Sequence, residues 1–518
     1  MVTLRIPVPK QQHRSNAASI AVLIALFIQS VVPRSTVAEP TPISPHHEAW
    51  RRHFHQPTQP ALIGSGERPQ PLRQRAQRPA QAQRAVFGFL PYWISADYYD
   101  AIDFDLLTHI APFSIEVNPD GSLGEDHDWP WTALVDRAHR HDVRVILTAT
   151  LFGDADVLAL LGDETSRARF MRQISDKVKA GNADGVIIDF EGPGQNGWPD
   201  QIAGFLRDLT EYLHAEIPGS EVSFASPAID WSNRWDFAAI AASCDYLFVM
   251  GYAFSGSWSS AAGPTAPLSG SGRTITSLLS EDRDYGQVVR EHPEKLILGV
   301  PYYGCRWKTR SGEAGAGVDD FVNYPRLRDA MPQAAEAGVR WDERSQTAWY
   351  RYQEEAQWLQ VWFDDTASLR RKYALAIDRN LRGFGMWALG YEGTHAEPWQ
   401  LIEELNGRRV PTLVETQSAL PATFAVSPLY PNPFNGRIHT SYQMPAAGRV
   451  QIELFDALGR SVRSWAQRAD RPGHATWSWD GRNNAGRSVA SGVYVVRFRF
   501  FSEVGALQTQ IRRIALLR

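Results

Sequence analysis

Eight short runs of apolar residues recur between residues 86 and 389, and stretches with a helical period lie between them. Most of the runs show little alternation of apolar and polar positions, which is typical of parallel strands buried on both faces. This pattern predicts an α/β fold, a TIM-type (β/α)8 barrel over residues 85–408. An open doubly wound sheet is the alternative, although no phosphate-binding glycine loop follows the first run. The runs are Val86–Leu90, Leu107–Ile115, Val143–Ala149, Gly185–Phe190, Val222–Ser226, Tyr246–Tyr252, Leu296–Tyr303 and Gly383–Leu389.

A different pattern follows the barrel. Residues 409–423 contain several prolines and no apolar period, as expected of a linker. Residues 424–518 then give short runs of period two, such as Val450–Phe455 and Val493–Phe498, with turns at 458–459 and 480–481. These features predict a small all-β, immunoglobulin-like sandwich.

The first 84 residues show neither pattern. Basic residues precede an apolar run at 17–32, and small residues follow it as far as Ala38. This order is typical of a secretory signal peptide over residues 1–38. An uncleaved membrane anchor is the alternative, although the run is short for a span of about 20 residues. Residues 39–84 are rich in Pro, Gln and Arg, which predicts a disordered tether. We therefore expect an exported protein with no integral membrane segment after signal cleavage.

Length and charge limit the classes of partner. A chain of 518 residues leaves room for a barrel and a second module. The formal net charge of −4 provides no basic field for nucleic acid, so we expect no nucleic-acid partner. The 18 Trp, 17 Tyr and 23 Phe would suit a surface that stacks on sugar rings, with core packing as the ordinary alternative.

Export permits disulfides, yet the chain has only two cysteines. On the predicted strands, Cys244 begins the sixth strand and Cys305 follows the end of the seventh. They would then lie at opposite ends of the barrel, on the order of 20 Å apart at about 3.3 Å per residue. A disulfide needs Cα atoms within roughly 7 Å, so we expect two free thiols.

The fourth predicted strand carries two acids near its end. Residues 184–191 read Asp-Gly-Val-Ile-Ile-Asp-Phe-Glu. Because strand side chains alternate, Ile187, Asp189 and Glu191 should point into the barrel mouth, where barrel enzymes place their chemistry. Neighbouring carboxylates repel, which pushes the outer one, Glu191, toward the protonated form that a general acid needs. A structural ion pair is the alternative.

This segment resembles the D-G-x-D-x-D-x-E signature of glycoside hydrolase family 18, which includes chitinases, N-acetylglucosaminidases and chitinase-like lectins. Five other segments resemble strands of the same family: 86–93, 107–110, 248–252, 298–304 and 383–391. Residues 256–264 and 362–369 look like the branch that includes spore-cortex and peptidoglycan-associated members.

The resemblance implies retaining hydrolysis of glycans with β-1,4-linked N-acetylglucosamine, assisted by the substrate's own acetamido group and needing no cofactor or metal ion. Glu191 would protonate the glycosidic oxygen. Asp189 would hold the acetamido nitrogen, Tyr252 would hydrogen-bond the acetamido oxygen, and Trp387 would form the floor beneath the sugar. Further residues expected to line the groove, with packing as the alternative for the aromatic ones, are Tyr92, Trp93, Met250, Tyr302 and Tyr303.

Two positions depart from the family pattern. Ile187 stands in place of the middle Asp, so Asp189 lacks a carboxyl partner; we expect Asp189 to ionise more readily and thereby to favour protonated Glu191. Ala253 stands where an Asp usually follows Met-x-Tyr, which removes a hydrogen-bond acceptor for the substrate. Because both acids remain, we favour a glycosidase over a non-hydrolytic carbohydrate-binding barrel or a scaffold with a vestigial groove. Chitin, peptidoglycan and N-glycans all stay open as substrates.

The C-terminal region has a resemblance of its own. Residues 430–435, 455–460, 479–481 and 491–494 look like the sorting domain of type IX secretion cargo, which is similar to the immunoglobulin-like module of the flagellar hook-capping protein. The resemblance implies that secretion machinery carries the protein through the outer membrane of a Gram-negative bacterium, to be released or attached to the cell surface. An accessory β-sandwich is the alternative.

Overall fold

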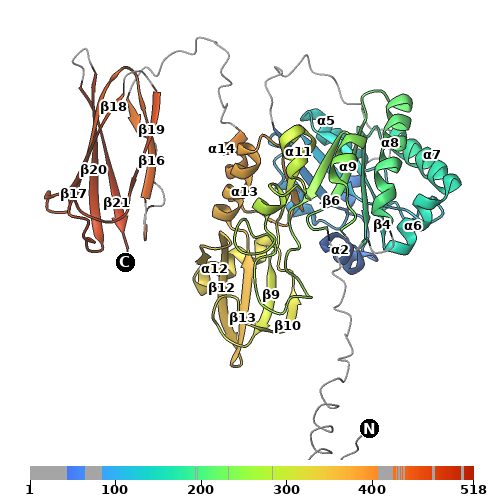
Figure 1. Cartoon of the computed structure of the whole chain (residues 1–518), viewed down its shortest axis with the longest axis horizontal. Coiled ribbons are helices and arrows are strands. Elements are labelled where there is room, and N and C mark those ends of the chain that lie inside the picture. The colour runs from blue at the N-terminus through green and yellow to red at the C-terminus, as the bar shows by residue number, and fades with distance from the viewer. Residues whose placement is uncertain are drawn as a thin grey trace, which may run out of the picture. The chain divides into compact units, whose positions relative to one another are not determined.

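The computed structural model describes residues 44–64, 84–406 without 193, 195–196, 231–232 and 283, and 424–517 without 427–428, 430–431, 433, 436–437, 470–472 and 503–506. The predicted signal peptide, residues 1–38, and the predicted linker, residues 409–423, lie outside these ranges. The chain divides into two compact units between residues 409 and 410. The first unit combines a sheet with helices, and the second consists of strands (Figure 1).

Eight parallel strands form a closed barrel in the first unit (Figure 1). β1 pairs with β2 on one side and with β14 on the other, and β2 pairs with β4, which closes the ring. Almost every residue of these strands is buried, as their continuous apolar runs require. The predicted barrel is confirmed, and the open sheet is wrong. In ring order the strands are β1 (Ala85–Pro91), β2 (His109–Phe113), β4 (Arg144–Phe152), β5 (Gly185–Glu191), β6 (Glu221–Pro227), β7 (Tyr246–Met250), β8 (Leu296–Pro301) and β14 (Gly383–Trp387), with the short β3 (Ile115–Glu116) beside β4.

Helices connect the strands and cover the outside of the ring (Figure 1). In α7, Asp163 caps the first turn by accepting a hydrogen bond from the Ser166 backbone N–H (2.8 Å). Phe170, Ile174 and Val178 follow at intervals of four, and all three are buried on one face. The helices are α4 (Ala96–Asp100), α5 (Thr132–Arg140), α6 (Asp154–Gly162), α7 (Glu164–Ala180), α8 (Pro199–Glu216), α9 (Phe237–Ser243), α10 (Ile275–Leu278), α11 (Gly286–Glu291), the 3-10 helix η1 (Pro293–Lys295), α13 (Thr366–Asp378) and α14 (Glu397–Asn406).

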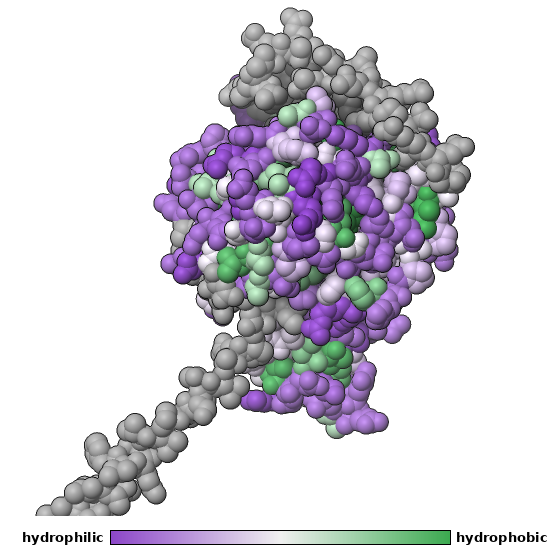
Figure 2. All heavy atoms as spheres, turned by 90° about the vertical axis from the view of Figure 1, so that its right-hand side faces the viewer, coloured by the Kyte–Doolittle hydropathy of each residue, from purple (hydrophilic) through white to green (hydrophobic). Residues whose placement is uncertain are grey.

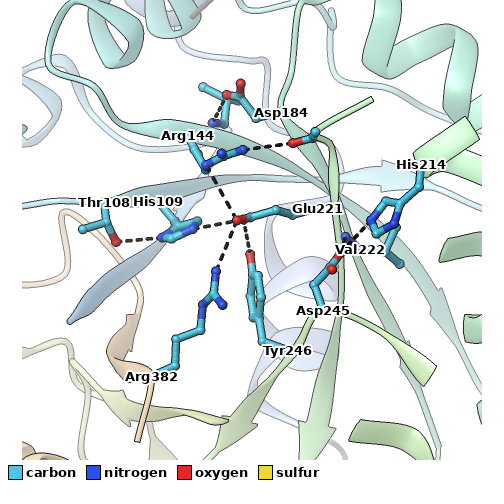
Figure 3. Close-up of polar contacts among 12 residues, drawn as sticks. Thr108, His109, Arg144, Asp184, His214, Glu221, Val222, Asp245, Tyr246 and Arg382 are labelled. Atoms are coloured by element: carbon cyan, nitrogen blue, oxygen red, sulfur yellow. Dashed lines mark hydrogen bonds and ion pairs between the residues drawn. The ribbon is translucent and has the colours of Figure 1, made fainter. Parts of the chain in front are cut away.

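A polar network joins the strands at the amino-terminal end of the barrel (Figure 3). The carboxylate of Glu221, at the start of β6, accepts hydrogen bonds from His109 Nε2 (3.0 Å) and the Tyr246 hydroxyl (3.3 Å). Arg382 Nη2 lies 3.2 Å and Arg144 Nε 3.6 Å from the same carboxylate. Burial acts to raise the Glu221 pKa, but the hydrogen bond from His109 and the two guanidinium charges lower it to about 2. In barrels this end serves stability, and the chemistry lies at the other end.

An antiparallel sheet is inserted between β8 and β14. Its strand order is β10-β9-β13-β12-β11. Cys305, Trp307, Trp349 and Trp362 pack into a small core of this insertion, together with Ala262. The apolar runs of the sequence predict no strand here. The elements are β9 (Cys305–Thr309), β10 (Val318–Asn323), α12 (Leu327–Ala337), β11 (Arg340–Asp342), β12 (Thr347–Glu354) and β13 (Gln357–Phe363).

Residues 44–64 fold onto the barrel, which corrects the prediction of a disordered tether for this part of residues 39–84; residues 39–43 and 65–83 lie outside the described residues. The Ser44 hydroxyl accepts a hydrogen bond from the His47 backbone N–H (3.0 Å) and so caps the first helix. Contacts with the barrel hold the segment in place, among them the Thr58 hydroxyl, which donates to the His127 carbonyl (2.8 Å). The two helices are α2 (Pro45–His53) and α3 (Pro60–Ile63).

The second unit is a sandwich of two antiparallel sheets, with strand orders β15-β16-β19 and β18-β17-β20-β21. Buried side chains from both sheets, such as Trp479 and Phe498, form its core. Gly459 and Gly481 adopt positive φ angles of 78° and 71° at the predicted turns. The predicted sandwich is confirmed. Its strands are β15 (Ala425–Val426), β16 (Ile438–Met444), β17 (Gly448–Asp456), β18 (Ser461–Ala469), β19 (Gly473–Trp479), β20 (Gly492–Ser502) and β21 (Leu507–Leu516).

Cys244 and Cys305 are both buried free thiols, which confirms that prediction. Across the part of the chain that the structure describes, no helix combines the length and apolar character needed to span a membrane. The face shown in Figure 2 is mainly hydrophilic, and its apolar side chains form small scattered groups.

Candidate active site

Two carboxylates stand at the carboxyl end of β5. Asp189 and Glu191 lie on the same side of the strand because side chains alternate, and Ile187 lies one alternation deeper. Asp189 and Ile187 are fully buried, and Glu191 is 8% exposed. Both acids therefore lie at the mouth of the barrel.

A histidine from α2 contacts both acids. His46 Nδ1 lies 2.8 Å from Oδ2 of Asp189 and 3.4 Å from Oε1 of Glu191. At the other side of the ring, Nε2 lies 2.7 Å from the hydroxyl of Tyr252, which follows β7. The imidazole also stacks on Trp387, the last residue of β14, with ring centroids 3.7 Å apart and an interplanar angle of 29°. One fully buried ring thus brings together the ends of three barrel strands.

Burial controls the protonation of this group. It raises the pKa of Asp189 to about 7. Burial, together with the charge of Asp189, raises the pKa of Glu191 well above its usual range. Burial lowers the pKa of His46 to about 4, although the charge of Glu191 opposes this. At neutral pH the ring is therefore uncharged and Glu191 holds a proton, as the repulsion between the two acids predicts.

The expectation that Ile187, compared with a carboxyl at that position, lets Asp189 ionise more readily stays a prediction, although burial keeps the Asp189 pKa above its usual range. Isoleucine removes the repulsion of a carboxyl partner and provides no polar group of its own, while Thr148 and Ser223 lie in register with it on the neighbouring strands and Asp189 itself is fully buried. Such surroundings disfavour the charged form, and burial is the larger effect here.

The hydrogen-bond roles follow from these protonation states. Burial raises the pKa of Tyr252 well above its usual range, so its hydroxyl keeps the proton and donates to His46 Nε2. The neutral ring then carries its hydrogen on Nδ1, which donates to Asp189. The barrel thus offers an acceptor, a donor and an aromatic face to a flat group that has one N–H and one acceptor.

A pocket of 310 Å³ remains beside Glu191. Met250 and Ala253 line it from the barrel, as do the side chains of three tryptophans: Trp198, Trp235 and Trp258. A second pocket of 50 Å³ is lined by Tyr303 and Trp387. Residues of α2 line both pockets, so the helix divides the space above the barrel mouth.

The profile of the glycosyl hydrolases family 18 matches residues 88–392, which include both acids, Tyr252 and Trp387. The chain belongs to this family. The profile of the FlgD Ig-like domain matches residues 435–499 of the second unit.

Related proteins share the family 18 barrel. The putative sporulation-specific glycosylase YdhD of Bacillus subtilis is 27% identical over 327 residues, which cover 60% of this chain and 73% of that protein. The di-N-acetylchitobiase of Mus musculus is 29% identical over 276 residues, which cover 48% of this chain and 71% of that protein. Among solved structures, the GH18 chitinase of Cycas revoluta in complex with (GlcNAc)3 has a TM-score of 0.54 at 21% identity, covering 62% of this chain and 99% of that chain.

The neighbouring candidates Tyr302 and Tyr303 point in opposite directions. Tyr303 makes an edge contact with Tyr252, with ring centroids 6.1 Å apart, and lines the smaller pocket. Tyr302 faces the other way, and its hydroxyl lies 3.1 Å from that of Tyr373 on α13. Tyr302 therefore packs in the barrel wall, which corrects its predicted place in the groove.

The other aromatic candidates contact α2. Tyr92 is fully buried, stacks on His127 with centroids 3.6 Å apart, and donates its hydroxyl to the His53 carbonyl (2.8 Å). The Trp93 ring stacks on the His53 ring, with centroids 4.4 Å apart and an interplanar angle of 7°. Both residues lie at the edge of the barrel mouth, beneath the end of the helix.

His46, Asp189 and Glu191 are the one group of His, Cys, Asp and Glu, among the residues that the structure describes, whose ligand atoms lie close enough to hold a metal ion, all within 4.8 Å. In the arrangement seen here, Nδ1 of His46 donates to Asp189 and Glu191 holds a proton, so a cation would have to displace both hydrogens to bind all three side chains.

His46 and the pocket tryptophans are absent from the sequence-based candidates. His46 lies 143 residues before Asp189 in the chain, in a segment whose composition indicates a tether. Trp198 and Trp235 follow β5 and β6 in loops, where no strand period shows which way a side chain points.

Proposed function

We propose that the barrel is a glycosidase that hydrolyses glycans containing β-1,4-linked N-acetylglucosamine, with retention at the anomeric carbon. The convergence of Asp189, Tyr252 and Trp387 on one flat ring carries this proposal. A 2-acetamido group presents the same polar edge as that ring, an N–H donor and an acceptor oxygen, attached to a sugar that can stack on an aromatic face.

In the proposed reaction, Glu191 gives its proton to the glycosidic oxygen. The acetamido oxygen attacks the anomeric carbon of its own sugar, the glycosidic bond breaks, and a cyclic oxazolinium ion forms. Asp189 accepts the acetamido N–H and stabilises the positive charge, while the Tyr252 hydroxyl donates to the acetamido oxygen. Water then attacks the anomeric carbon from the side of the departed group and passes a proton to Glu191, which restores the acid.

The pocket beside Glu191 supports a polymeric substrate. Its position next to the acid suits the sugar on the leaving-group side of the bond, and its three tryptophans offer stacking faces. The names of similar proteins, a di-N-acetylchitobiase and a cortical fragment-lytic enzyme, agree with this substrate class. Chitin-type glycans and peptidoglycan are therefore the substrates to test.

The experiment replaces Glu191 by Gln, which keeps the shape and a hydrogen-bond donor but removes the transferable proton. Release of reducing ends from chitooligosaccharides and purified peptidoglycan should fall about 10²–10⁴-fold, while oligosaccharide binding survives. Glu216→Gln is the matched control, because Glu216 is a partly exposed carboxylate at the last residue of α8, where it pairs with Lys179.

The alternative is a carbohydrate-binding barrel without hydrolysis. The wild-type protein would then bind oligosaccharides but cleave no N-acetylglucosamine polymer, even after the His46 side chain is removed from the site by substitution. That result would reject the hydrolase and support the lectin.

We also propose that the second unit directs the protein to the cell exterior as a type IX sorting domain. The immunoglobulin-like sandwich agrees with the resemblance that motivates this proposal, and the motifs at residues 455–460 and 479–481 lie at or near turns of this sandwich. The protein would then be secreted or held at the cell surface.

A further inference from the structure

We propose that α2 is a built-in inhibitor of the barrel, with His46 in the position that the substrate's acetamido group must take. This inference rests on the proposed function, because it names what regulates that same site. It extends the function to the N-terminal segment, which lies outside the residues matched by the family profile.

The neutral His46 ring is chemically equivalent to the acetamido group in this site. His46 donates from Nδ1 to Asp189 and accepts at Nε2 from Tyr252, and its ring lies flat on Trp387. These are the three interactions that the proposed mechanism assigns to the acetamido group and its sugar. A neutral imidazole reproduces the acetamide because each has one N–H and one acceptor in the same plane.

Stacking of histidine rings on the barrel mouth extends along α2. Three histidines of α2 each stack on an aromatic side chain of the barrel mouth, where sugar rings would otherwise stack. Burial lowers the pKa of each of these histidines, so all three stack as uncharged rings. The pairs, with their centroid distances, are His46 on Trp387 (3.7 Å), His47 on Phe152 (4.5 Å) and His53 on Trp93 (4.4 Å).

Contacts outside the site anchor α2. Trp50 Nε1 donates to the Glu116 carboxylate (2.7 Å), which follows the second barrel strand. About one turn further along α2, Arg326 Nη2 donates to His53 Nε2 (3.0 Å). Both contacts anchor the C-terminal half of the helix, one to β3 and one to the residue before α12.

Occupancy by His46 and by a sugar is mutually exclusive. The imidazole is fully buried between Trp387 and the two acids, and only 8% of Glu191 is exposed. A sugar can take the position against Trp387 and Asp189 only when α2 has moved away, so the helix acts as a competitive inhibitor within the same chain.

The test compares His46→Ala with His55→Ala in the full chain. His55 is exposed just after the helix and serves as the matched control. Removing the ring abolishes two hydrogen bonds and a stack, so turnover of chitooligosaccharides should rise at least tenfold for His46→Ala and stay at the wild-type level for His55→Ala. Circular dichroism verifies that both variants are folded. In a Glu191→Gln background, His46→Ala should also tighten oligosaccharide binding at least tenfold, and this readout does not depend on catalysis.

Hydrogen exchange provides a measurement that needs no substitution at position 46. Saturating oligosaccharide, added to the Glu191→Gln chain, should speed amide exchange in residues 44–64 because the glycan displaces the helix.

The outcomes separate the two proposals. Equal binding and turnover in the His46 and His55 variants, or slower exchange of residues 44–64 on binding, would overturn the inhibitor while leaving the hydrolase in place. Absence of both binding and cleavage in every variant would overturn the proposed function, and the inhibitor with it. Activation of the wild-type protein by a chelator to the level of His46→Ala would show that a bridging cation holds His46 in place of the hydrogen bond to Asp189, and would overturn the proposed mimicry of the acetamido group.

Discussion

On β5, Ile187 occupies the position one alternation deeper than Asp189. The alternation of strand side chains was sufficient to predict that Asp189 and Glu191 share one side of the strand at the barrel mouth. It could not predict the direction of the Asp189 pKa shift, because that depends on what covers the site. Burial raises this pKa to about 7, so the pair carries at most one negative charge at neutral pH, and the proton stays on Glu191.

The opposite orientations of Tyr302 and Tyr303 follow from the sequence. Neighbouring residues of an extended strand point to opposite faces, so two adjacent tyrosines at the end of β8 cannot both face the mouth. Tyr303 contacts Tyr252, and Tyr302 contacts Tyr373 in the wall. The rule predicts the opposition, but only the packing of α13 shows which of the two points inward.

At the scale of elements, α2 combines clear local signals with a misleading composition. Ser44 is an N-cap, Pro45 stands in the first turn, and basic residues fill the last turn, all of which favour a helix over residues 45–53. A nine-residue helix is only marginally stable by itself in water, and few of its residues are apolar. Contacts with the barrel stabilise it, and no local pattern predicts those contacts.

The sequence does not predict the inserted sheet, for a different reason. β12 and β13 form a hairpin whose two-residue loop, Glu355 and Ala356, has both φ angles positive at 46° and 68°. Such turns usually carry Asn-Gly or Asp-Gly, which is the strongest short-range sign of a hairpin. Here two residues without that signature adopt the conformation, so the turn could not be read from the sequence.

The network at the amino-terminal end of the barrel supports a prediction about stability. The Glu221 pKa falls from 4.5 to about 2 on folding, so its ionised form stabilises the folded state above about pH 4.5, and that contribution is lost as the pH falls toward 2. Glu221→Gln should lower the free energy of unfolding by about 3 kcal/mol at pH 7 and by progressively less below pH 4.5. Chemical denaturation across this range measures the difference.

Glu216→Gln is the control for this measurement. Glu216 forms a partly exposed surface pair with Lys179, so the substitution should change the free energy of unfolding by less than about 1 kcal/mol both at pH 7 and below pH 4.5. A Glu221→Gln effect that stayed constant down to pH 3, or grew there, would show that the carboxylate does not stabilise the barrel through its charge.

At the scale of the whole molecule, the two units have separate cores, one in the barrel and one in the sandwich. Deleting residues 424–518 should therefore leave the barrel folded, with the same hydrolytic rate per molecule. If the second unit is a sorting domain, the deletion should trap the barrel in the periplasm of a host with type IX machinery. Cell fractionation measures this, and equal delivery of the deletion variant to the exterior would reject the sorting role.

Retention at the anomeric carbon is the most direct consequence of the proposed site. It requires that the acetamido group, held by Asp189, Tyr252 and Trp387, attack before water does. Proton NMR of the first product released from a β-linked N-acetylglucosamine oligomer, with the His46→Ala chain as the enzyme, distinguishes the two stereochemical courses. The account predicts that the β-anomer appears first and then equilibrates. Initial release of the α-anomer would mean direct attack by water with inversion, and would contradict the substrate-assisted mechanism.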